Sequence, residues 1–553
     1  MGWIDWAVVA VYLLAMLGMA VWLGRRQRDR ADYYVGGHRT GAVPIALSTM
    51  ATQCSTNSLL GAPAFVAFSA GGGLLWLQYE LAVPLAMVPV MLFLLPVFRR
   101  HGLISVYHYL ELRFGVATRL VLSGLFQLMR AFATGVIVYG MGLVLQSVLD
   151  LPFWASVLLL GLATVGYDVL GGIRAVIYSD VVQMLVLVVM IWVMFAFALD
   201  VVGGWDAMWA AFPQERVRTL DFAANGFSDG VDFAFWPMLI GGFLLYIAYY
   251  GCDQSQVQRE LSSKDVDGTN MALFLNGVFR FPVVLSYCLL GVAIGAYAAV
   301  DPTFVERLPL QTLWRDGAMV QVPNYNLAVP SFILQEFPPG LVGLAFVALF
   351  AAAMSSLDSV LNSLSAVTME DFVRRFWPAH LHPANELRWS RVLTLCWGLV
   401  TIAAAFVVGR IADSVLVAIN MVSSLINGPI LGVFALGLLT RRTTGTGALT
   451  GFAAGFLANL LVALAAPAVS WLWWNLIGFA ATVGVGLAVG VWTSTGAAAA
   501  AVDDRLVWSH TMLGWLGYRR RWSRYQVALV VWTAAMFGLL WMLPQWVAPA
   551  ALA

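Results

Sequence analysis

Long apolar stretches recur from one end of this 553-residue chain to the other, and they restrict its fold more than any other feature. Hydrophobic residues make up 61% of the sequence and charged residues only 11%, whereas soluble chains carry about a quarter charged residues. A stretch of about 20 apolar residues is long enough to cross a bilayer as a helix. We therefore predict one all-α, polytopic membrane protein rather than several soluble domains.

About fourteen stretches are long enough to be transmembrane helices. The predicted spans cover residues 4–23, 44–67, 74–97, 119–147, 152–170, 178–200, 234–252, 271–299, 339–367, 390–409, 412–439, 445–466, 469–493 and 525–543. The first span has no basic segment before it, so it is interpreted as an uncleaved membrane helix and not as a signal peptide.

The distribution of basic residues predicts the orientation. When the N-terminus is placed outside and the spans alternate, most of the 30 Lys and Arg residues fall in inner segments, as the positive-inside rule requires. Both termini are then expected outside, in a multi-pass protein of the plasma (inner) membrane.

Several classes of function have no support in the sequence. No basic run indicates nucleic acid, and no segment indicates an obligate protein partner. The four scattered cysteines form no disulfide framework. The histidines combine with no nucleophile or further metal ligand, and no loop is long enough for a catalytic domain. We expect a protein that is not an enzyme and whose partners are the lipid bilayer and small solutes.

Ionisable residues within apolar spans are expensive, so each is a functional hypothesis. They are Glu80, Arg130, Asp180, Arg280 and Asp358. Two interpretations of the arginines stay open. Either internal carboxylates pair with them, or a substrate carboxylate completes one of them, which the planar guanidinium suits.

One span, "LFAAAMSSLDSVLNSLSAVTMEDF" (349–372), carries a ladder of hydroxyl groups. Ser355 and Ser356 lie four and three residues before Ser359, so all three share a helix face. Hydroxyl oxygens suit a small hard cation, but backbone carbonyls must complete its shell, and these are free only where a helix is unwound. The simpler interpretation is that the serines bond to their own helix or join neighbouring helices.

A second span, "IALSTMATQCSTNSLLGAPAF" (45–65), is predicted to be broken. Short polar side chains compete for its backbone, and Pro63 lacks an amide hydrogen. A broken helix that faces a polar helix is a known arrangement of transporter sites.

Five stretches carry a family resemblance. They are "ADYYVGG" (31–37), "ATQCSTNSLLG" (51–61), "GGIRAVIYSDVVQ" (171–183), "DQSQVQR" (253–259) and "MSSLDSVLNSLSAVTMEDF" (354–372). The chain resembles the sodium:solute symporter family, which includes sodium/galactose, sodium/proline, sialic acid and monocarboxylate symporters.

The resemblance implies a leucine-transporter-like fold with two inverted repeats of five helices each. The repeats would cover about 44–200 and 234–439 within a transporter core of residues 31–442. Residues 1–30 would form an extra N-terminal transmembrane helix, and residues 443–553 the C-terminal transmembrane helices.

The resemblance also implies the ligands of sodium. The main site would use Ala51, Cys54, Ala352, Ser355 and Ser356, with backbone oxygens from the broken helix. A second sodium site, present in some members, would involve Asp180, Asp358 and Ser359. Asp358 stands where the family has a hydroxyl group, which leaves three roles open: it strengthens the site, carries a proton, or pairs with an arginine.

For the substrate, Glu80 matches a sugar-contacting glutamate and Tyr249 an aromatic inner gate. Arg130 lies where sialic acid symporters place a carboxylate-binding arginine, and Arg280 where the galactose symporter has a lysine. Tyr246 replaces a sugar-binding asparagine. The full expected substrate set is Ser58, Gln78, Glu80, Arg130, Tyr246, Tyr249, Arg280 and Asn420.

Together these features predict a secondary active symporter, driven by Na+, that imports a small organic solute by alternating access. The solute would bear a carboxylate, as sialic acids and monocarboxylates do, or be sugar-like. The alternative is a transporter-like membrane sensor without net transport. Relatives of that kind usually carry an appended signalling domain, which this sequence does not show.

Overall fold

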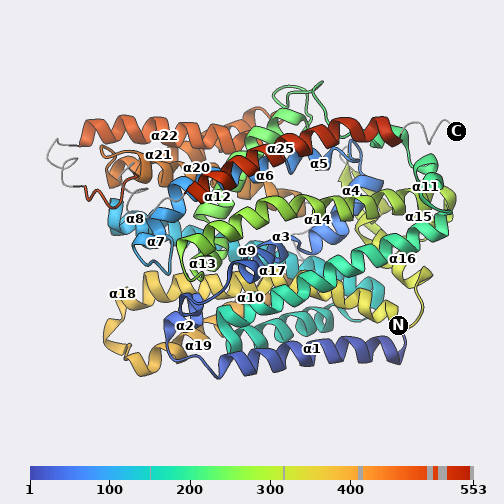
Figure 1. The fold of residues 1–553 in the computed structure, drawn as a ribbon, viewed down its shortest axis with the longest axis horizontal. Helices are drawn as coiled ribbons and strands as arrows, with labels where there is room; N and C mark the ends of the chain where they lie inside the picture. Colours follow the sequence, from blue (N-terminus) through green and yellow to red (C-terminus); the bar gives the residue numbers. More distant parts are fainter. Residues whose placement is uncertain (150, 316–317, 409–414, 495–501, 509–519, 548–553) are drawn as a thin grey trace.

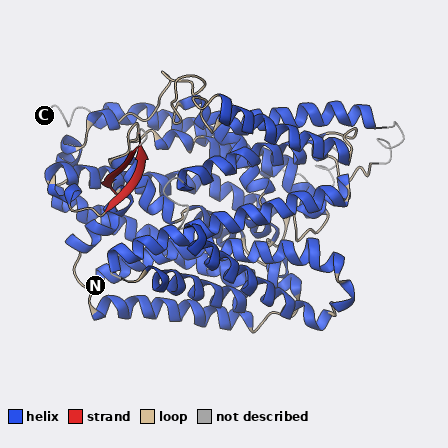
Figure 2. Ribbon diagram, turned by 180° about the vertical axis from the view of Figure 1, so that it is seen from behind, coloured by secondary structure: helices blue, strands red, loops and turns tan. Residues whose placement is uncertain are grey.

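Long helices lie side by side along the longest axis of the molecule (Figure 1). The computed structural model describes residues 1–149, 151–315, 318–408, 415–494, 502–508 and 520–547. Its strands are β1 (Leu310–Arg315) and β2 (Ala318–Pro323), an antiparallel pair in which Leu310 lies opposite Pro323 (Figure 2).

Within the described residues, ten helical segments are long and apolar enough to cross a membrane. They are α1 (Trp3–Gly24), the run Trp76–Arg100, α9 (Val116–Leu149), α10 (Phe153–Val202), α14 (Val266–Val300), the run Leu341–Phe376 that contains α17 (Leu341–Val367), α19 (Pro383–Val408), α21 (Gly445–Ala465), α22 (Trp473–Thr493) and α25 (Arg520–Val547). Three shorter apolar helical segments are Ser58–Ala67, Pro237–Cys252 and Ser423–Leu439. The membrane-protein class is thereby supported, whereas the count of fourteen spans stays a prediction.

The remaining helices are short or join the long ones. They are α2 (Arg30–Val35), α3 (Ala42–Gln53), α4 (Ala62–Ala67), α5 (Trp76–Tyr79), α6 (Ala82–Pro89), α7 (Leu95–Arg100), α8 (Tyr107–Phe114), α11 (Trp205–Ala211), α12 (Gly242–Cys252), α13 (Gln254–Leu261), α15 (Thr303–Glu306), α16 (Ala328–Glu336), α18 (Arg374–Phe376) and α20 (Val415–Leu439).

Both ends of the described chain lie at the same end of the molecule. The start of α1 and the end of α25 are at the end that carries α11, α15 and α16, whereas α2, α8, α13 and α18 lie at the other end (Figure 1). An even number of crossings produces this placement, as the distribution of basic residues also predicts.

Helix α10 contains the two predicted spans 152–170 and 178–200 in one 50-residue element. Gly172 interrupts it with φ +56° and ψ −164°. A Cβ atom at this position would stand 2.8 Å from the carbonyl oxygen of Tyr33. Only glycine combines this backbone conformation with such close packing against the neighbouring helix α2.

Helix α17 lies at the centre of the bundle. In its most apolar stretch 89% of the residues are buried, compared with 28% in α1 and 17% in α25. Its alanines and serines let the neighbouring backbones approach closely, as small residues do in membrane proteins. This helix is therefore the most enclosed of the ten long segments, and its hydroxyl groups face protein and not lipid.

Candidate functional site

Helix α3 ends in the middle of the predicted span 44–67. The helix stops at Gln53, and Cys54 has φ −77° and ψ +59°, which is outside the helical region. A π-helical turn follows at Asn57–Gly61, and α4 then begins at Ala62. The hydroxyl of Ser58 donates to the carbonyl oxygen of Gln53 at 3.1 Å, which is the competition for the backbone that short polar side chains provide. The predicted break is confirmed.

The last turn of α3 faces the serines of α17. Ser355 Oγ donates to the carbonyl oxygen of Ala51 at 3.1 Å, and Ser356 Oγ donates to that of Thr52 at 3.1 Å. The carbonyl oxygen of Ala352 lies 3.2 Å from Ser355 Oγ and 3.4 Å from Ser356 Oγ. We call these five residues the sodium corner. Three carbonyl and two hydroxyl oxygens converge there, a set that can replace the water around a small cation.

Four of the five residues expected at the main sodium site thus lie together. In the described contacts Ser355 bonds to the carbonyl of Ala51 and Ser356 to that of Thr52, and neither serine bonds to that of Cys54. The motif named Ala51 and Cys54 as backbone ligands but not Thr52, because only the course of the chain at the break decides which carbonyl oxygen faces α17.

The residues expected at a second sodium site also lie together, beside Arg259. Asp180 Oδ2 accepts hydrogen bonds from Ser48 Oγ at 2.5 Å and from Arg259 Nη2 at 3.3 Å. Arg259 also donates to the hydroxyl of Ser359, and Ser359 Oγ lies 3.1 Å from Asp358 Oδ1. We call Asp180, Arg259, Asp358 and Ser359 the carboxylate cluster.

Arg259 on α13 is a buried cation. Arg259 has 0% exposed area. Its guanidinium group donates to Ser48 Oγ on α3 at 2.7 Å and to the carbonyl oxygen of Ser255 in its own helix, α13. A buried guanidinium group needs such partners on all sides, and these come from distant parts of the sequence.

Asp358 accepts a hydrogen bond from the hydroxyl of Tyr167 on α10. Among the described residues it forms no ion pair with an arginine. Of the three roles left open by the sequence, direct pairing with an arginine is therefore not what the structure shows.

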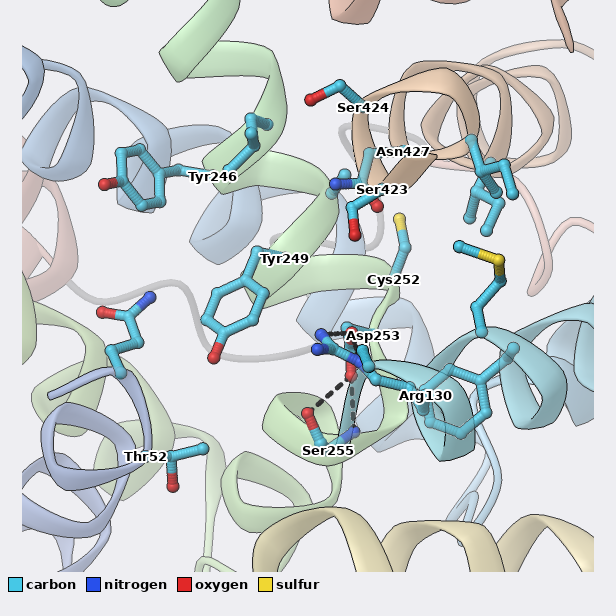
Figure 3. A pocket seen from close by; sticks show the side chains of 18 of the residues that line it. Thr52, Arg130, Tyr246, Tyr249, Cys252, Asp253, Ser255, Ser423, Ser424 and Asn427 are labelled. Atoms are coloured by element: carbon cyan, nitrogen blue, oxygen red, sulfur yellow. Dashed lines mark hydrogen bonds and ion pairs between the residues drawn. The ribbon is translucent and has the colours of Figure 1, made fainter. Parts of the chain in front are cut away.

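A cavity of about 430 Å³ opens beside the sodium corner. Ser356 lines it, together with Arg130, Tyr246, Tyr249 and Arg280 from the expected substrate set. Further lining residues are Thr52, Gln53, Ser55, Trp76, Tyr79, Phe233, Asp253, Ser423, Ser424, Asn427 and Trp471. Figure 3 shows Tyr246 and Tyr249 on α12, with Ser423, Ser424 and Asn427 on α20 beside them. A few polar groups in an aromatic wall are typical of small-molecule sites.

Arg130 on α9 is paired within the protein. Its guanidinium donates to Asp253 Oδ2, at 2.8 Å from Nε, and lies 5.6 Å from the ring centre of Tyr249 (Figure 3). Asp253 begins α13 and also accepts from the backbone amide of Ser255 at 2.8 Å. The pair joins α9 to the junction of α12 and α13, directly beside the expected gate residue.

Arg280 on α14 is paired as well. Its Nε and Nη2 donate to the two oxygens of Glu80 at 2.6 and 3.1 Å, and Nη2 lies 3.2 Å from the hydroxyl of Tyr246. Glu80 is only 1% exposed and does not line the cavity. The internal-pairing interpretation therefore describes both arginines in this structure.

Two other expected substrate residues lie away from the cavity lining. Gln78 is fully buried, donates to the carbonyl of Phe233 at 2.8 Å and accepts from the amide of Asp221 at 3.0 Å, so it fastens the loop before α12. Ser58 bonds across the break in α3. Asn420 lies in α20 at a position whose side chain is outside the described part of the chain.

Comparison with known proteins decides the family. The family model "Sodium:solute symporter family" matches residues 33–455. The chain belongs to the sodium:solute symporter family. Its coupling ion is Na+, and it is a multi-pass membrane transporter.

Relatives of the chain include several symporters of this family. The human "Sodium/iodide cotransporter" is 31% identical over 84% of this chain and 70% of its own length. The "Sodium/sialic acid symporter NanT" of Aliivibrio fischeri is 30% identical over 88% of this chain and 92% of its own length. The human "Sodium-coupled monocarboxylate transporter 1" is 30% identical over 84% and 73%.

Solved structures agree with the fold. A substrate-bound, outward-open Na+-coupled sialic acid symporter superposes with a TM-score of 0.76 at 25% identity, over 89% of this chain and 98% of its own. Mhp1, a nucleobase-cation-symport-1 transporter, gives a TM-score of 0.52 at 13% identity, over 91% of this chain and 98% of its own, and shows the fold alone.

Proposed function

We propose that this symporter imports a small organic solute, of the carboxylate-bearing or sugar-like class, through the cavity beside the sodium corner. The observation that carries the proposal is the contact between the broken end of α3 and the serines of α17. Ser356 belongs both to the sodium corner and to the cavity lining. Sodium and solute therefore bind to adjoining surfaces of the same two helices.

Sodium acts by fixing the break in α3. With the ion bound, the carbonyls of Ala51 and Thr52 are held against α17, so the backbone of the cavity-lining residues Gln53 and Ser55 is fixed before the solute binds. Each ligand then raises the affinity of the other by the same factor. A membrane potential of 100 mV adds about 2.3 kcal/mol for each charge that moves inward, so uptake is expected to be electrogenic.

We place the protein in the plasma (inner) membrane with fourteen crossings and both termini outside. The number follows when the two parts of α10 and the three shorter apolar helices are counted with the long ones. The five-plus-five inverted repeat is proposed for about 44–200 and 234–439, within the core 31–442. Segments 1–30 and 443–553 add helices outside that repeat.

Uptake by proteoliposomes tests the proposal. An inward sodium gradient, with potassium as the matched control ion, is imposed in the presence of N-acetylneuraminate, lactate, galactose or iodide. We expect accumulation of one organic solute that depends on sodium. No accumulation of any organic solute would contradict the proposal, and sodium-dependent binding without accumulation would favour the sensor alternative.

A further inference from the structure

One side-chain oxygen in the cavity receives two hydrogen-bond donors from different helices. The hydroxyl of Tyr250 on α12 donates to Gln53 Oε1 at 2.5 Å, and Arg280 Nη1 on α14 donates to the same atom. Gln53 is the last residue of α3 and lines the cavity. The two donors thus define a place for one acceptor oxygen, at the edge of the break.

The guanidinium group of Arg280 is oriented for this role. Its Nε and Nη2 are held by the two oxygens of Glu80, which fixes the plane of the group. Nη1 is the remaining nitrogen, and it points to the end of α3. Glu80 is therefore a positioning residue, because it sets the direction in which Arg280 Nη1 points into the cavity.

We propose that the oxygen of Gln53 stands where a substrate carboxylate oxygen binds, so that Arg280 and Tyr250 form an anion subsite. A carboxylate forms charge-assisted hydrogen bonds with these donors, which are about twice as strong as bonds to a neutral amide. The substrate displaces the side chain of Gln53, which acts as an internal competitor. The inference rests on the proposed function and deepens it by choosing the carboxylate class over the sugar-like class.

The position of Gln53 connects this exchange with sodium. Its backbone carbonyl accepts from Ser58 across the break, and it directly follows Thr52, whose carbonyl belongs to the sodium corner. Release of the Gln53 side chain by an anion therefore acts on the segment that holds the ion. Arg130 also lines the cavity, and its Nε and Nη2 donate to Asp253 Oδ2.

Two substitutions at Gln53 test the subsite in opposite directions. Gln53→Glu attaches a carboxylate to the chain at the subsite, so sodium-dependent binding of N-acetylneuraminate or lactate should fall at least about tenfold. Gln53→Ala removes the competitor, so the same binding should tighten by about threefold. Binding is measured by calorimetry on the purified full chain, which carries no other substitution. The sodium-induced rise in the midpoint of thermal unfolding checks that each variant is folded.

Asn427→Asp is the matched control for charge. Asn427 also lines the cavity, on α20, and this change is likewise from amide to acid (Figure 3). We expect Asn427→Asp to weaken anion binding much less than Gln53→Glu. Equal losses would mean general repulsion and would overturn the subsite.

Three other results would also overturn it. Gln53→Glu could bind the acids as the wild type does, or Gln53→Ala could lose more than about tenfold in affinity, which would make Gln53 a direct contact of the substrate. Galactose could be transported and neither acid bound, which would leave the proposed function standing. If sodium drives no solute into proteoliposomes at all, the proposed function itself fails.

Discussion

The sodium corner and the carboxylate cluster lie one helical turn apart on α17, yet they treat positive charge in opposite ways. Ser355 and Ser356 in the corner face uncharged carbonyl oxygens. Ser359 in the cluster accepts a hydrogen bond from Arg259, which also bonds to Asp180. The cluster therefore contains its own cation, whereas the corner has oxygens that an ion from solution can use.

This difference indicates at which of the two regions Na+ can bind and leave at a low cost in free energy. A hydroxyl–carbonyl contact is a modest hydrogen bond, and Na+ replaces it without leaving a buried charge. Removing the guanidinium group from the cluster leaves the buried carboxylate of Asp180 without its cation, at a cost of several kcal/mol. We expect the corner to bind and release the coupling ion while the cluster holds α3, α10, α13 and α17 together.

The largest effect is expected from Arg259→Gln. This substitution leaves the carboxylate of Asp180 buried without its cation, so stability should fall by about 3–5 kcal/mol. The midpoint of thermal unfolding in detergent measures the loss, and the double variant Arg259→Gln/Asp180→Asn should recover much of it. A single variant as stable as the wild type would show that the cluster holds nothing together.

A smaller effect, on ion binding, is expected from Ser355→Ala/Ser356→Ala. The corner loses both hydroxyl ligands, and the sodium affinity should fall by about a hundredfold or more. Sodium-dependent uptake measures this loss. Ser363→Ala is the matched control, because Ser363 is a buried serine of the same helix whose hydroxyl, among the described residues, donates to the carbonyl of Val360 at 2.8 Å and not to α3. Equal losses in both variants would contradict the assignment.

The pair of Arg130 and Asp253 extends the comparison to the cavity. Its side chains are 27% and 13% exposed, so a double-mutant cycle with Arg130→Gln and Asp253→Asn should give a coupling energy of only about 1 kcal/mol. Binding of acidic solutes should change by less than about threefold in Arg130→Gln. A complete loss of acid binding would show that Arg130, and not Arg280, receives the carboxylate.

The smallest effect is expected from Tyr246→Phe. The lost hydroxyl lies 3.2 Å from Arg280 Nη2 and 3.5 Å from Glu80 Oε1, while the Arg280–Glu80 pair keeps its other bonds. The loss of solute affinity should be about 1 kcal/mol or less. A loss of tenfold or more in calorimetry would make Tyr246 a principal substrate ligand.

The sequence predicted the elements of this site better than the contacts between them. The break in α3 and the shared face of Ser355 and Ser356 follow from local composition and helical periodicity, so both could be read directly. The partners of Arg259 could not, because Ser48, Asp180 and Ser359 come from three distant helices.

The carboxylate partners of Arg130 and of Arg280 could not be predicted for the same reason. Sequence shows which charges enter the membrane, but only packing decides which carboxylate each arginine reaches. Gln53 was visible only as a polar residue near a break, and its two donors arrive from α12 and α14. Thr52 was missed although its neighbours Ala51 and Cys54 were named, because only the course of the chain at the break decides which carbonyl oxygen faces α17.

Binding of radioactive sodium to the purified protein is the most direct test of the division between the two regions. We compare the wild type, Ser355→Ala/Ser356→Ala, and Ser359→Ala, which alters the cluster but keeps both hydroxyl groups of the corner. We predict that the first variant loses sodium binding and that Ser359→Ala retains it. Retained binding in the first variant, with binding lost in Ser359→Ala, would place the coupling ion in the carboxylate cluster instead.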